Sequence, residues 1–517
     1  MASSPEFLKD AGSDKLESHP GSSGPDSADQ LLETMGYKPE LARNRSTLQV
    51  AFMSFVLAAI PYGLATTLYY PLVGGGPVNV LWGWVGVSII IVCVASSLGE
   101  ITSVYPTAGG VYYQAFMLAP ARWRRISSWI CGWLYLVGNI TITLSVNFGT
   151  TLFFIGCVNV FENSSGGPVL EGTTYQTYLI FLGITLLCNA VSALGNKWLP
   201  LLDTAAIYWT FAGVIAIMIT VLVMAKEGRH SAEYVFTHFE PLTGWTPGWS
   251  FCVGLLHAAY ATSSTGMIIS MCEEVQRPAE QVPKAMVYTI FINTFAGLLF
   301  LVPLLFVLPD IQVLIATAQP MPVILKSAVG SSGGAFGLVF PLMVLAIICG
   351  IGCTTATSRC VWAFSRDGAV PGSQIWMKVN KKLDVPVNAM MLSMAVQLIL
   401  GLLYFGSTAA FNAFSGVGVI CLTVAYAVPI AISLATGRKQ VKTGKFYLGT
   451  LGTVCNVISI AWTLLVIPLF CMPTVIPVTT ETVNYAPVVF VFAIGVSGIW
   501  YWAWGHKNYA GPPTHEE

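Results

Sequence analysis

The sequence predicts an all-α membrane protein with twelve transmembrane helices. Its residues are 55% apolar and only 9% charged, whereas a soluble protein carries about 25% charged residues. Twelve apolar segments follow one another along the 517 residues, most of them close to the roughly 20 residues that cross a bilayer as a helix. The basic residues gather on one side of these segments. Together the three observations favour a polytopic membrane protein over a soluble one.

The apolar segments set the expected boundaries of the helices. A helix is the natural choice for each of them, because it satisfies every backbone polar group inside lipid. We expect the spans at residues 48–70, 80–98, 127–154, 176–195, 204–225, 248–271, 285–308, 335–364, 387–405, 412–434, 447–472 and 484–504.

The distribution of lysine and arginine predicts the orientation. With an inside N-terminus, 21 of the 24 basic residues lie on the cytoplasmic side, and only Lys226, Arg229 and Lys326 lie on the other side. Cytoplasmic segments of membrane proteins carry such an excess of positive charge. We therefore expect both termini in the cytoplasm. The sequon at Asn163 then falls in an outside loop, where it predicts N-glycosylation.

The connections carry two further expectations. The Ser/Gly-rich stretches at 71–79, which contains GGGP, and 164–172 are expected as outside loops. After span 2, one apolar face followed by three arginines predicts a short amphipathic helix at the cytoplasmic interface, with an ordinary solvated loop as the alternative. The apolar face consists of Tyr112, Tyr113, Phe116 and Met117, and the arginines are Arg122, Arg124 and Arg125.

The first span contains an interruption near its middle, in the stretch LAAIPYGLAT. Pro61 removes a backbone donor, and Gly63 removes side-chain restraint on the backbone. A break at this depth is tolerated only beside protein or a water-lined cavity. A proline kink used only for packing is the alternative interpretation.

The sixth span contains a second interruption, the polar run TSSTG at residues 262–266. A packing seam of small residues, or hydroxyls that bond to their own helix, are alternative interpretations. The two interruptions lie five spans apart, and because five is odd, a five-span repeat returns inverted in the membrane. Paired breaks in corresponding spans of inverted halves point to the central site of a transporter.

Eight motifs carry a resemblance to a known family. They are GYKPELARNRS before span 1, GGGP at 74–77, YPTAGGVYYQAFMLAP at 105–120, CGWLYLVGNITITLSVNFG at 131–149, SMCEEVQRPAEQVPKAM at 270–286, FSRDGAVPGS at 364–373, VPVNA at 385–389 and NYAPVVFVFAIGVSGIWYWAWGHKNYAGP at 484–512. On these motifs the chain resembles the amino acid–polyamine–organocation (APC) superfamily of secondary transporters. It is most similar to the fungal branch of GABA and choline permeases, over about residues 36–512.

The resemblance implies a leucine-transporter-like fold, in which a five-plus-five inverted repeat is followed by two peripheral helices. We accordingly expect a ten-helix transport core at 47–434 and peripheral spans 11 and 12 within 435–504. The polar composition of residues 1–46 predicts a disordered cytoplasmic tail, and 505–517 form a second cytoplasmic tail. The family also implies alternating access and, as its usual energetics, proton-coupled import.

The two interruptions and the spans that face them supply the candidate substrate contacts. A half-helix N-terminus presents free N–H groups to an anionic group of the substrate. The candidates are Ala59, Ile60, Pro61, Tyr62 and Gly63 in span 1, Tyr260, Thr262, Ser263, Ser264 and Thr265 in span 6, and Tyr135, Asn139 and Thr143 on one face of span 3. Interhelical hydrogen bonding is the alternative role for the span 3 residues.

Three residues are candidates for coupling to an ion. His257 is the only ionisable side chain, tyrosine and cysteine aside, well inside a span, and histidine titrates near neutrality. Pathway lining and packing are its alternative roles. Thr354 and Thr355 of span 8 resemble the paired hydroxyls of sodium-dependent members of the superfamily. Span 5 lacks the lysine of other, proton-coupled members, so both a proton and a sodium ion stay open.

Charged residues at the expected cytoplasmic ends of spans 2, 6 and 8 are candidates for an inner gate of ion pairs. They are Glu100, Glu273, Glu274, Arg359 and Arg366. Charges near helix ends cost little, so interfacial solvation is the alternative.

The substrate stays open at this stage. With no carboxylate near mid-membrane, choline, another quaternary amine or a polyamine needs carbonyls or aromatic faces, whereas an amino acid or GABA can place its carboxylate at a half-helix N-terminus. We expect a transporter of a small amino compound, without cofactor, metal or nucleic acid, because the net charge is zero and the 12 cysteines lack metal spacing. The sequence shows no catalytic constellation of an enzyme, and a nutrient sensor on the same fold stays a further alternative. The plasma membrane is the expected location, with the vacuolar membrane as the alternative.

Overall fold

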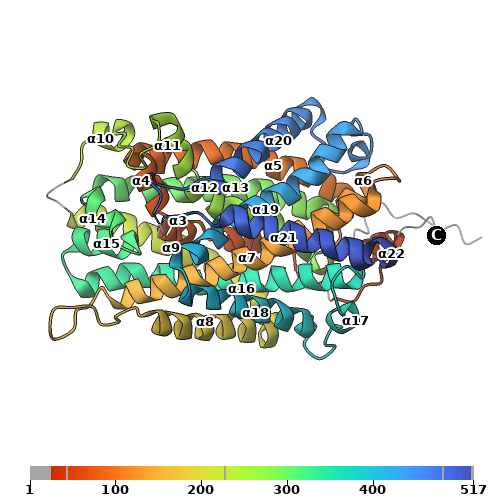
Figure 1. Ribbon diagram of the computed structural model, residues 1–517, viewed down its shortest axis with the longest axis horizontal. Coiled ribbons are helices and arrows are strands. Elements are labelled where there is room, and N and C mark those ends of the chain that lie inside the picture. The colour runs from red at the N-terminus through yellow and green to blue at the C-terminus, as the bar shows by residue number, and fades with distance from the viewer. Residues whose placement is uncertain (1–24, 42, 44, 226–228, 480–481, 514–517) are drawn as a thin grey trace, which may run out of the picture.

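The computed structural model describes residues 25–41, 43, 45–225, 229–479 and 482–513, and the regular elements of this part are all helices (Figure 1). Within it, twelve helical segments are long and apolar enough to cross a membrane. The predicted all-α fold with twelve spans is therefore confirmed. Boundaries moved by several residues: the third and eighth spans, expected at 127–154 and 335–364, run as Arg124–Val158 and Ser332–Arg366.

The spans consist of one to three helices each, where η marks a 3₁₀ or π helix. In chain order they are α2 and α3 (Thr47–Ala58, Ile60–Thr66), α4, η1 and α5 (Tyr69–Val78, Asn79–Gly83, Trp84–Val104), α7 (Arg124–Val158), α8 (Thr174–Leu194), η2 and α9 (Asn196–Trp198, Leu199–Met224), α11, α12 and η3 (Pro247–Gly254, Leu256–Thr262, Ser263–Glu274), α13 (Pro278–Phe306), α16 (Ser332–Arg366), α18 and η4 (Val387–Gly401, Leu402–Phe405), α19 (Thr408–Ala435), α20 (Gly449–Cys471), and α21, η6 and α22 (Ala486–Trp500, Tyr501–Gly505, His506–Asn508). The shorter connecting helices are α1 (Pro25–Thr34), α6 (Gly110–Leu118), α10 (Ala232–Thr237), α14 (Ile311–Ile315), α15 (Pro320–Val329), α17 (Ser373–Trp376) and η5 (Val441–Thr443).

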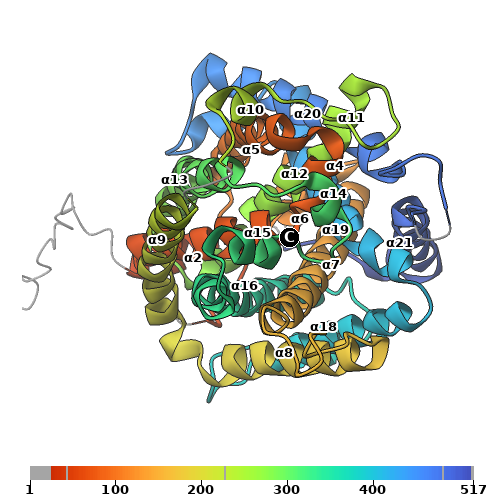
Figure 2. The same cartoon turned by 90° about the vertical axis from the view of Figure 1, so that its left-hand side faces the viewer.

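The helices form one bundle whose long axis runs along most of the spans (Figure 1). Seen along that axis, α3, α6, α12 and α15 lie near the centre, and α8 and α18 lie side by side on one flank (Figure 2). Helix α21 lies on another flank, against α7 and α19 (Figure 2). We call the end that carries α6, α17 and α22 the basic end, and the end that carries α10, α14 and α15 the opposite end (Figure 1).

Both expected interruptions are present. In the first span α2 ends at Ala58, and Ala59 adopts left-handed backbone angles (φ 39°, ψ 52°) before α3 begins. Pro61 is the second residue of α3. An N–H group in the first turn of a helix has no acceptor within that helix, so the absence of an N–H in proline costs no hydrogen bond here. In the sixth span α12 gives way to a twelve-residue 3₁₀ helix at Ser263. Such a long 3₁₀ stretch is uncommon and marks a strained or functional segment.

The GGGP stretch was expected in an outside loop but forms part of a kinked helix. Helix α4 bends at Gly75 and Gly76, and Gly76 has a positive φ of 62°. A side chain at Gly74 is excluded, since a Cβ there would stand 2.8 Å from the Cα of Gly254 in α11. The glycines thus let the start of span 2 approach the outer part of span 6.

Two expectations about the basic end were wrong. Helix α6, expected as an amphipathic helix at the membrane surface, is covered by protein, and Tyr112 and Tyr113 are each 1% exposed because it packs between α7 and α19. Part of the expected disordered tail is folded, since α1 is a helix and Leu32 and Tyr37 are buried. The apolar residues in this short polar stretch find partners on the bundle; residues 1–24 lie outside the described part.

Candidate substrate site and gate

The two interruptions touch each other in the middle of the bundle. Ser264 Oγ at the start of η3 donates to the carbonyl oxygen of Leu57, at 2.8 Å, in the last turn of α2. A Cβ placed on Gly63 would stand 3.4 Å from the side chain of Ala261, so α3 and α12 approach closely as well. The predicted neighbourhood of the span 1 and span 6 residues is therefore present.

Two tyrosines bind the carbonyls of the 3₁₀ helix. Tyr135 of α7 donates its hydroxyl to the carbonyl oxygen of Gly266 at 3.2 Å, and Tyr426 of α19 donates to that of Ser263 at 3.0 Å. Their rings lie with centroids 6.3 Å apart. Tyr135 was expected at this place; Tyr426 was missed, because a tyrosine inside a long apolar span carries no distinguishing pattern.

The other hydroxyls of the polar run bond to their own span. Thr262 donates to Ala258, Ser263 to Tyr260 and Thr265 to Thr262, each through its hydroxyl to a backbone oxygen at 2.7–2.8 Å. These three side chains therefore follow the alternative interpretation, in which the hydroxyls bond to the backbone of their own span.

The side chains of the span 1 candidates face neighbouring helices. Tyr62 is 1% exposed, and its hydroxyl donates to Val146 O and lies 3.0 Å from Thr150 Oγ1, both in α7. Ala59, Ile60 and Pro61 are buried around the break.

The other two candidates of span 3 bind span 8 instead of the break. Thr143 Oγ1 lies 2.7 Å from Thr357 Oγ1, and both hydroxyls donate to the carbonyl oxygen of Asn139. Asn139 donates its amide to Tyr135 O at 2.7 Å, while its side-chain oxygen has no partner among the described residues. The alternative role, interhelical hydrogen bonding, accounts for Thr143.

Cavities reach the breaks from the opposite end. Tyr260 lines a cavity of about 100 Å³ together with Thr66, Thr67 and Tyr70. A larger cavity of about 460 Å³, lined also by Lys326, shares Gln319 with it. These two hollows mark a path from the opposite end toward the centre.

The coupling candidates are separated. His257 is buried, and its Nδ1 lies 3.1 Å from Thr67 Oγ1, which itself donates to the carbonyl oxygen of Gly63. His257 Nε2 and Thr354 Oγ1 have no partner in the described part of the chain. Thr355 instead bonds to Ile351 O and to Ser192 Oγ of α8, so the two threonines face different neighbours.

Four of the five gate candidates form ion pairs with one another at the basic end. Arg366 donates to both carboxylate oxygens of Glu273 at 2.8 and 3.0 Å, and its guanidinium lies 3.9 Å from the ring centre of Tyr37. Arg359 donates to Glu274 at 2.7 Å, and all four side chains are largely shielded from water. These pairs join the end of span 6 to the end of span 8.

Glu274 belongs to a longer buried network that the sequence did not reveal. Arg45 lies 3.6 Å from Glu274 and donates to Asp203 of α9 at 2.8 Å. The backbone of Arg45 also pairs with the end of η3, as its N–H donates to Glu274 O and its carbonyl accepts from Gln276. Arg45 was assigned to a tail and Asp203 to the edge of a span, so neither drew attention.

Glu100 is the exception among the gate candidates. Its carboxylate accepts from Arg438 at 2.6 Å through both oxygens and from the N–H of Leu448 at 2.7 Å. Arg438 also binds the start of α20 through Gly449 O. Glu100 thus fastens span 11 to span 2 instead of joining the ion pairs of spans 6 and 8.

A further carboxylate, that of Asp367, lies beside the ion pair of Arg366 and Glu273. It accepts hydrogen bonds from the hydroxyls of Tyr37, at 2.9 Å, and Tyr112, at 2.7 Å. Burial raises the pKa of Asp367 to about 6, although the nearby Arg366 and the two hydroxyls act in the lowering direction. This cluster fixes residues before span 1 against the end of span 8.

Comparison with known proteins agrees with this architecture. The model of the amino acid permease family matches residues 46–494. The chain belongs to this family. It is 30% identical to amino-acid permease BAT1 of Arabidopsis thaliana over 94% of the chain and 96% of that protein. It is 31% identical to polyamine transporter TPO5 (87% of the chain, 73% of the relative) and 28% identical to a choline transporter (90% and 82%), both of Saccharomyces cerevisiae.

As a member of the amino acid permease family with twelve apolar spans, the chain is a multi-pass membrane protein. Asn163 lies exposed in the connection after span 3, where its side-chain oxygen accepts from the N–H groups of Ser165 and Gly167. Among the described residues, no group of three histidine, cysteine or acidic side chains is placed to hold a metal ion.

Proposed function

We propose that this amino acid permease family member is a secondary active transporter, which moves a small amino compound such as an amino acid or GABA by alternating access. The observation that carries the proposal is the meeting of two interrupted spans, joined by the bond from Ser264 to Leu57 O, in the centre of a twelve-span bundle. Irregular backbone at this depth exposes polar groups, and transporters use such groups to bind substrate.

The substrate site lies around the two breaks. The first N–H groups of α3 have no partner earlier in their helix, and they suit a carboxylate. Tyr62, Tyr135 and Tyr260, with Tyr426, stand around the breaks and can face an amine. Of the predicted contacts we retain the span 1 residues, Tyr260 and Ser264 of span 6, and Tyr135 and Asn139 of span 3. We assign structural roles to Thr143, Thr262, Ser263 and Thr265, whose hydroxyls bond to backbone oxygens of their own spans.

Choline, another quaternary amine or a polyamine is the second candidate substrate. The tyrosines around the breaks favour it, because aromatic faces attract quaternary ammonium groups. The names of the relatives, which include a choline transporter and a polyamine transporter, are compatible with either substrate.

Alternating access needs one end closed while the other is open. The buried pairs of Glu273 and Glu274 with arginines hold the ends of spans 6 and 8 together at the basic end, while the two cavities beside the breaks lie toward the opposite end. We infer that breaking these pairs accompanies opening at the basic end, in a five-plus-five inverted repeat. The excess of Lys and Arg assigns this end to the cytoplasm, with both termini, and Asn163 to the outside, where it can be glycosylated.

The coupling ion is assigned to the proton. His257 is buried between the outer halves of spans 1 and 6, and one of its ring nitrogens is free of partners among the described residues. A sodium ion is the alternative coupling ion, because the hydroxyl of Thr354 is buried and has no hydrogen-bond partner among the described residues. The plasma membrane is the proposed location.

The test is uptake into proteoliposomes that contain the purified protein. Radiolabelled GABA, choline, a polyamine and a panel of amino acids are each offered with an inward proton gradient, a sodium gradient or neither. Accumulation of one compound under the proton gradient is the expected result. Binding without accumulation under any gradient contradicts transport and instead supports a nutrient sensor on the same fold.

A further inference from the structure

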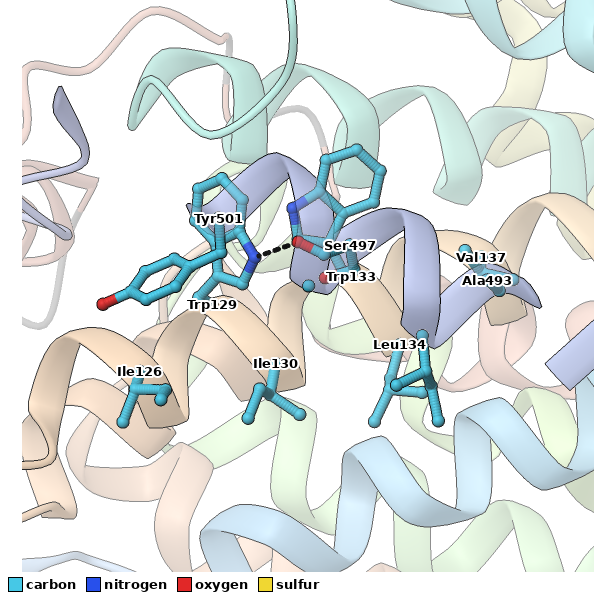
Figure 3. A pocket seen from close by; sticks show the side chains of 11 residues that line it. Ile126, Trp129, Ile130, Trp133, Leu134, Val137, Ala493, Ser497 and Tyr501 are labelled. Carbon is cyan, nitrogen blue, oxygen red and sulfur yellow. Dashed lines mark hydrogen bonds between the residues drawn. The ribbon is translucent and has the colours of Figure 1, made fainter. Parts of the chain in front are cut away.

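An apolar groove runs along the outside of the bundle between α7 and α21, away from the breaks (Figure 3). Its volume is about 170 Å³. Ile126, Ile130 and Leu134, four residues apart on α7, form one row, and Trp129 and Trp133 stand beside them (Figure 3).

Beside Ile494, the α21 wall of the groove consists of small residues, which leave the space open. Ala493, Ser497 and Gly498 contribute to it, and a Cβ added to Gly498 would meet no atom within 4 Å. Ile130 is 46% exposed, so the groove opens toward the surroundings of the bundle. In a membrane that surrounding is lipid.

The groove matches one leaflet in length and depth. From Ile126 to Val137 a helix rises about 16 Å, roughly half of the 30 Å hydrocarbon thickness. Tyr501 closes the groove at the basic end, where Trp123 and Trp502 are 53% and 76% exposed. Exposed aromatic residues of this kind mark the interface between lipid tails and headgroups.

Positive charge surrounds the basic end of the groove. Arg122 precedes α7, Arg125 lies in the first turn of α7, and Lys507 lies in α22; all three are exposed. The sequence holds no acidic residue from 101 to 161 or from 482 to 515, so the stretches that contain these two helices contribute no negative charge. A polar cavity of about 780 Å³ next to it, lined by Arg124 and Arg125, also contains two acids, Glu40 and Asp367.

We propose that this groove is a binding site for an anionic phospholipid of the leaflet at the basic end. One acyl chain fills the groove between α7 and α21, and the phosphate lies among Arg122, Arg125 and Lys507. Charge complementarity favours an anionic headgroup over a neutral one, because each basic residue at the membrane surface attracts the negative charge of the headgroup. A second copy of the chain is a less suitable occupant, because the basic rims of two copies repel each other.

Helix α7 connects the bound acyl chain with the transport site. Helix α7 carries Trp133 toward the groove and, two residues later, Tyr135 toward Gly266 of η3. A lipid that supports the outer face of α7 therefore stabilises the position from which Tyr135 holds the second break. Occupancy of the groove is accordingly expected to affect transport as well as lipid binding.

The experiment measures lipids retained by the purified protein with native mass spectrometry, after addition of phosphatidylglycerol or phosphatidylcholine with identical acyl chains. Gly498→Leu fills the groove. Gly495→Leu is the matched control, because Gly495 lies in the same helix with equally open space but does not line the groove. We expect phosphatidylglycerol retention to fall at least ten-fold in G498L and to stay unchanged in G495L.

A variant with an intact groove keeps the test decisive if G498L fails to fold. Arg122→Gln with Lys507→Gln changes only exposed side chains, and should lower retention of phosphatidylglycerol by about five-fold per residue without affecting phosphatidylcholine. Equal retention of the two lipids by the wild type, or unchanged retention in both variants, overturns the proposal. A dimer that G498L abolishes overturns it too, since a second copy then fills the groove.

Discussion

Ser264 has a role that none of its neighbours shares. Its hydroxyl crosses from span 6 to Leu57 O in span 1, whereas Ser263 bonds back to Tyr260 in its own span. The carbonyl of Leu57 lies two residues before the left-handed Ala59, and the thiol of Cys349, at 3.7 Å, is its only other side-chain donor among the described residues. One side chain thus joins the two breaks.

Ser264→Ala should therefore destabilise the protein by about 0.6–1.5 kcal/mol, the usual range for a hydrogen bond between helices. It should also lower uptake of the substrate, because the two breaks lose their link. Thermal unfolding of the purified protein, beside the uptake assay, measures both effects. Ser263→Ala is the control and should change little; equal effects of the two substitutions would contradict the assigned role.

Gly266 offers a second test at this scale. A Cβ there would stand 2.5 Å from Cε1 of Tyr426, so Gly266→Ala should cost about 1–3 kcal/mol through overpacking. In a Tyr426→Leu background the added methyl group has more room and should cost clearly less. Melting temperatures of the four proteins measure this coupling, with Gly495→Ala as a neutral control. Additive effects would show that Tyr426 does not confine Gly266.

At the scale of elements, the end of η3 is held by charges that are buried together. Glu274 stands between Arg359 and Arg45, and Asp203 is the other acid that contacts Arg45. A buried ion pair contributes little by itself, but removal of one partner leaves an uncompensated charge. The network is therefore more important for keeping the basic end closed than for overall stability.

Glu274→Gln should cost about 3–5 kcal/mol in the closed state, since both arginines lose their shared carboxylate. We expect faster amide hydrogen exchange in residues 263–276. The control is Glu280→Gln, which breaks the pair with Lys445, a side chain that is 67% exposed, and should cost less than about 1 kcal/mol. Unchanged exchange in E274Q would contradict a gate at this position.

The Asp367 cluster predicts a pH effect on the segment before span 1. The groups that act on the carboxylate are Arg366, Tyr112, Tyr37 and Glu273. While the segment is docked, the pKa of Asp367 is about 6; when water reaches the carboxylate, the pKa returns toward its ordinary value of about 3.9. The docked form binds the proton more tightly, so its added stability is complete below about pH 4 and disappears as the pH rises through 6.

Docking of residues 29–41 should accordingly be tighter at pH 5 than at pH 7. Hydrogen exchange of this segment, corrected for the intrinsic effect of pH, measures the difference. In Asp367→Asn the side chain cannot titrate, and protection should be the same at both values. A wild-type segment with equal protection at pH 5 and pH 7 would contradict the argument.

The sequence predicts the elements well and their partners poorly. Hydropathy located the twelve spans, and proline, glycine and a polar run located both breaks, because these are local properties. The partner of Glu100 is 338 residues away at Arg438, and charge near a helix end carries no mark of its partner. Likewise, whether a buried hydroxyl bonds to its own turn or to another span depends on packing, as Ser263 and Ser264 show.

At the scale of the whole molecule, the two ends of the bundle differ. Ion pairs join spans 6 and 8 at the basic end, whereas two cavities extend from the opposite end toward the breaks. His257 lies on that second side, linked through Thr67 to the carbonyl of Gly63. We propose that proton coupling begins at this histidine, because it lies before the second break on the side of the opposite end.

His257→Gln should therefore flatten the pH dependence of uptake and reduce accumulation under a proton gradient, because glutamine keeps a polar side chain but cannot titrate. Thr67→Val is the matched variant: it removes the partner of Nδ1 and leaves the histidine able to titrate. We expect T67V to shift the pH profile and H257Q to abolish it. An unchanged profile in H257Q would exclude the histidine from proton coupling, and the search would then turn to the buried hydroxyl of Thr354.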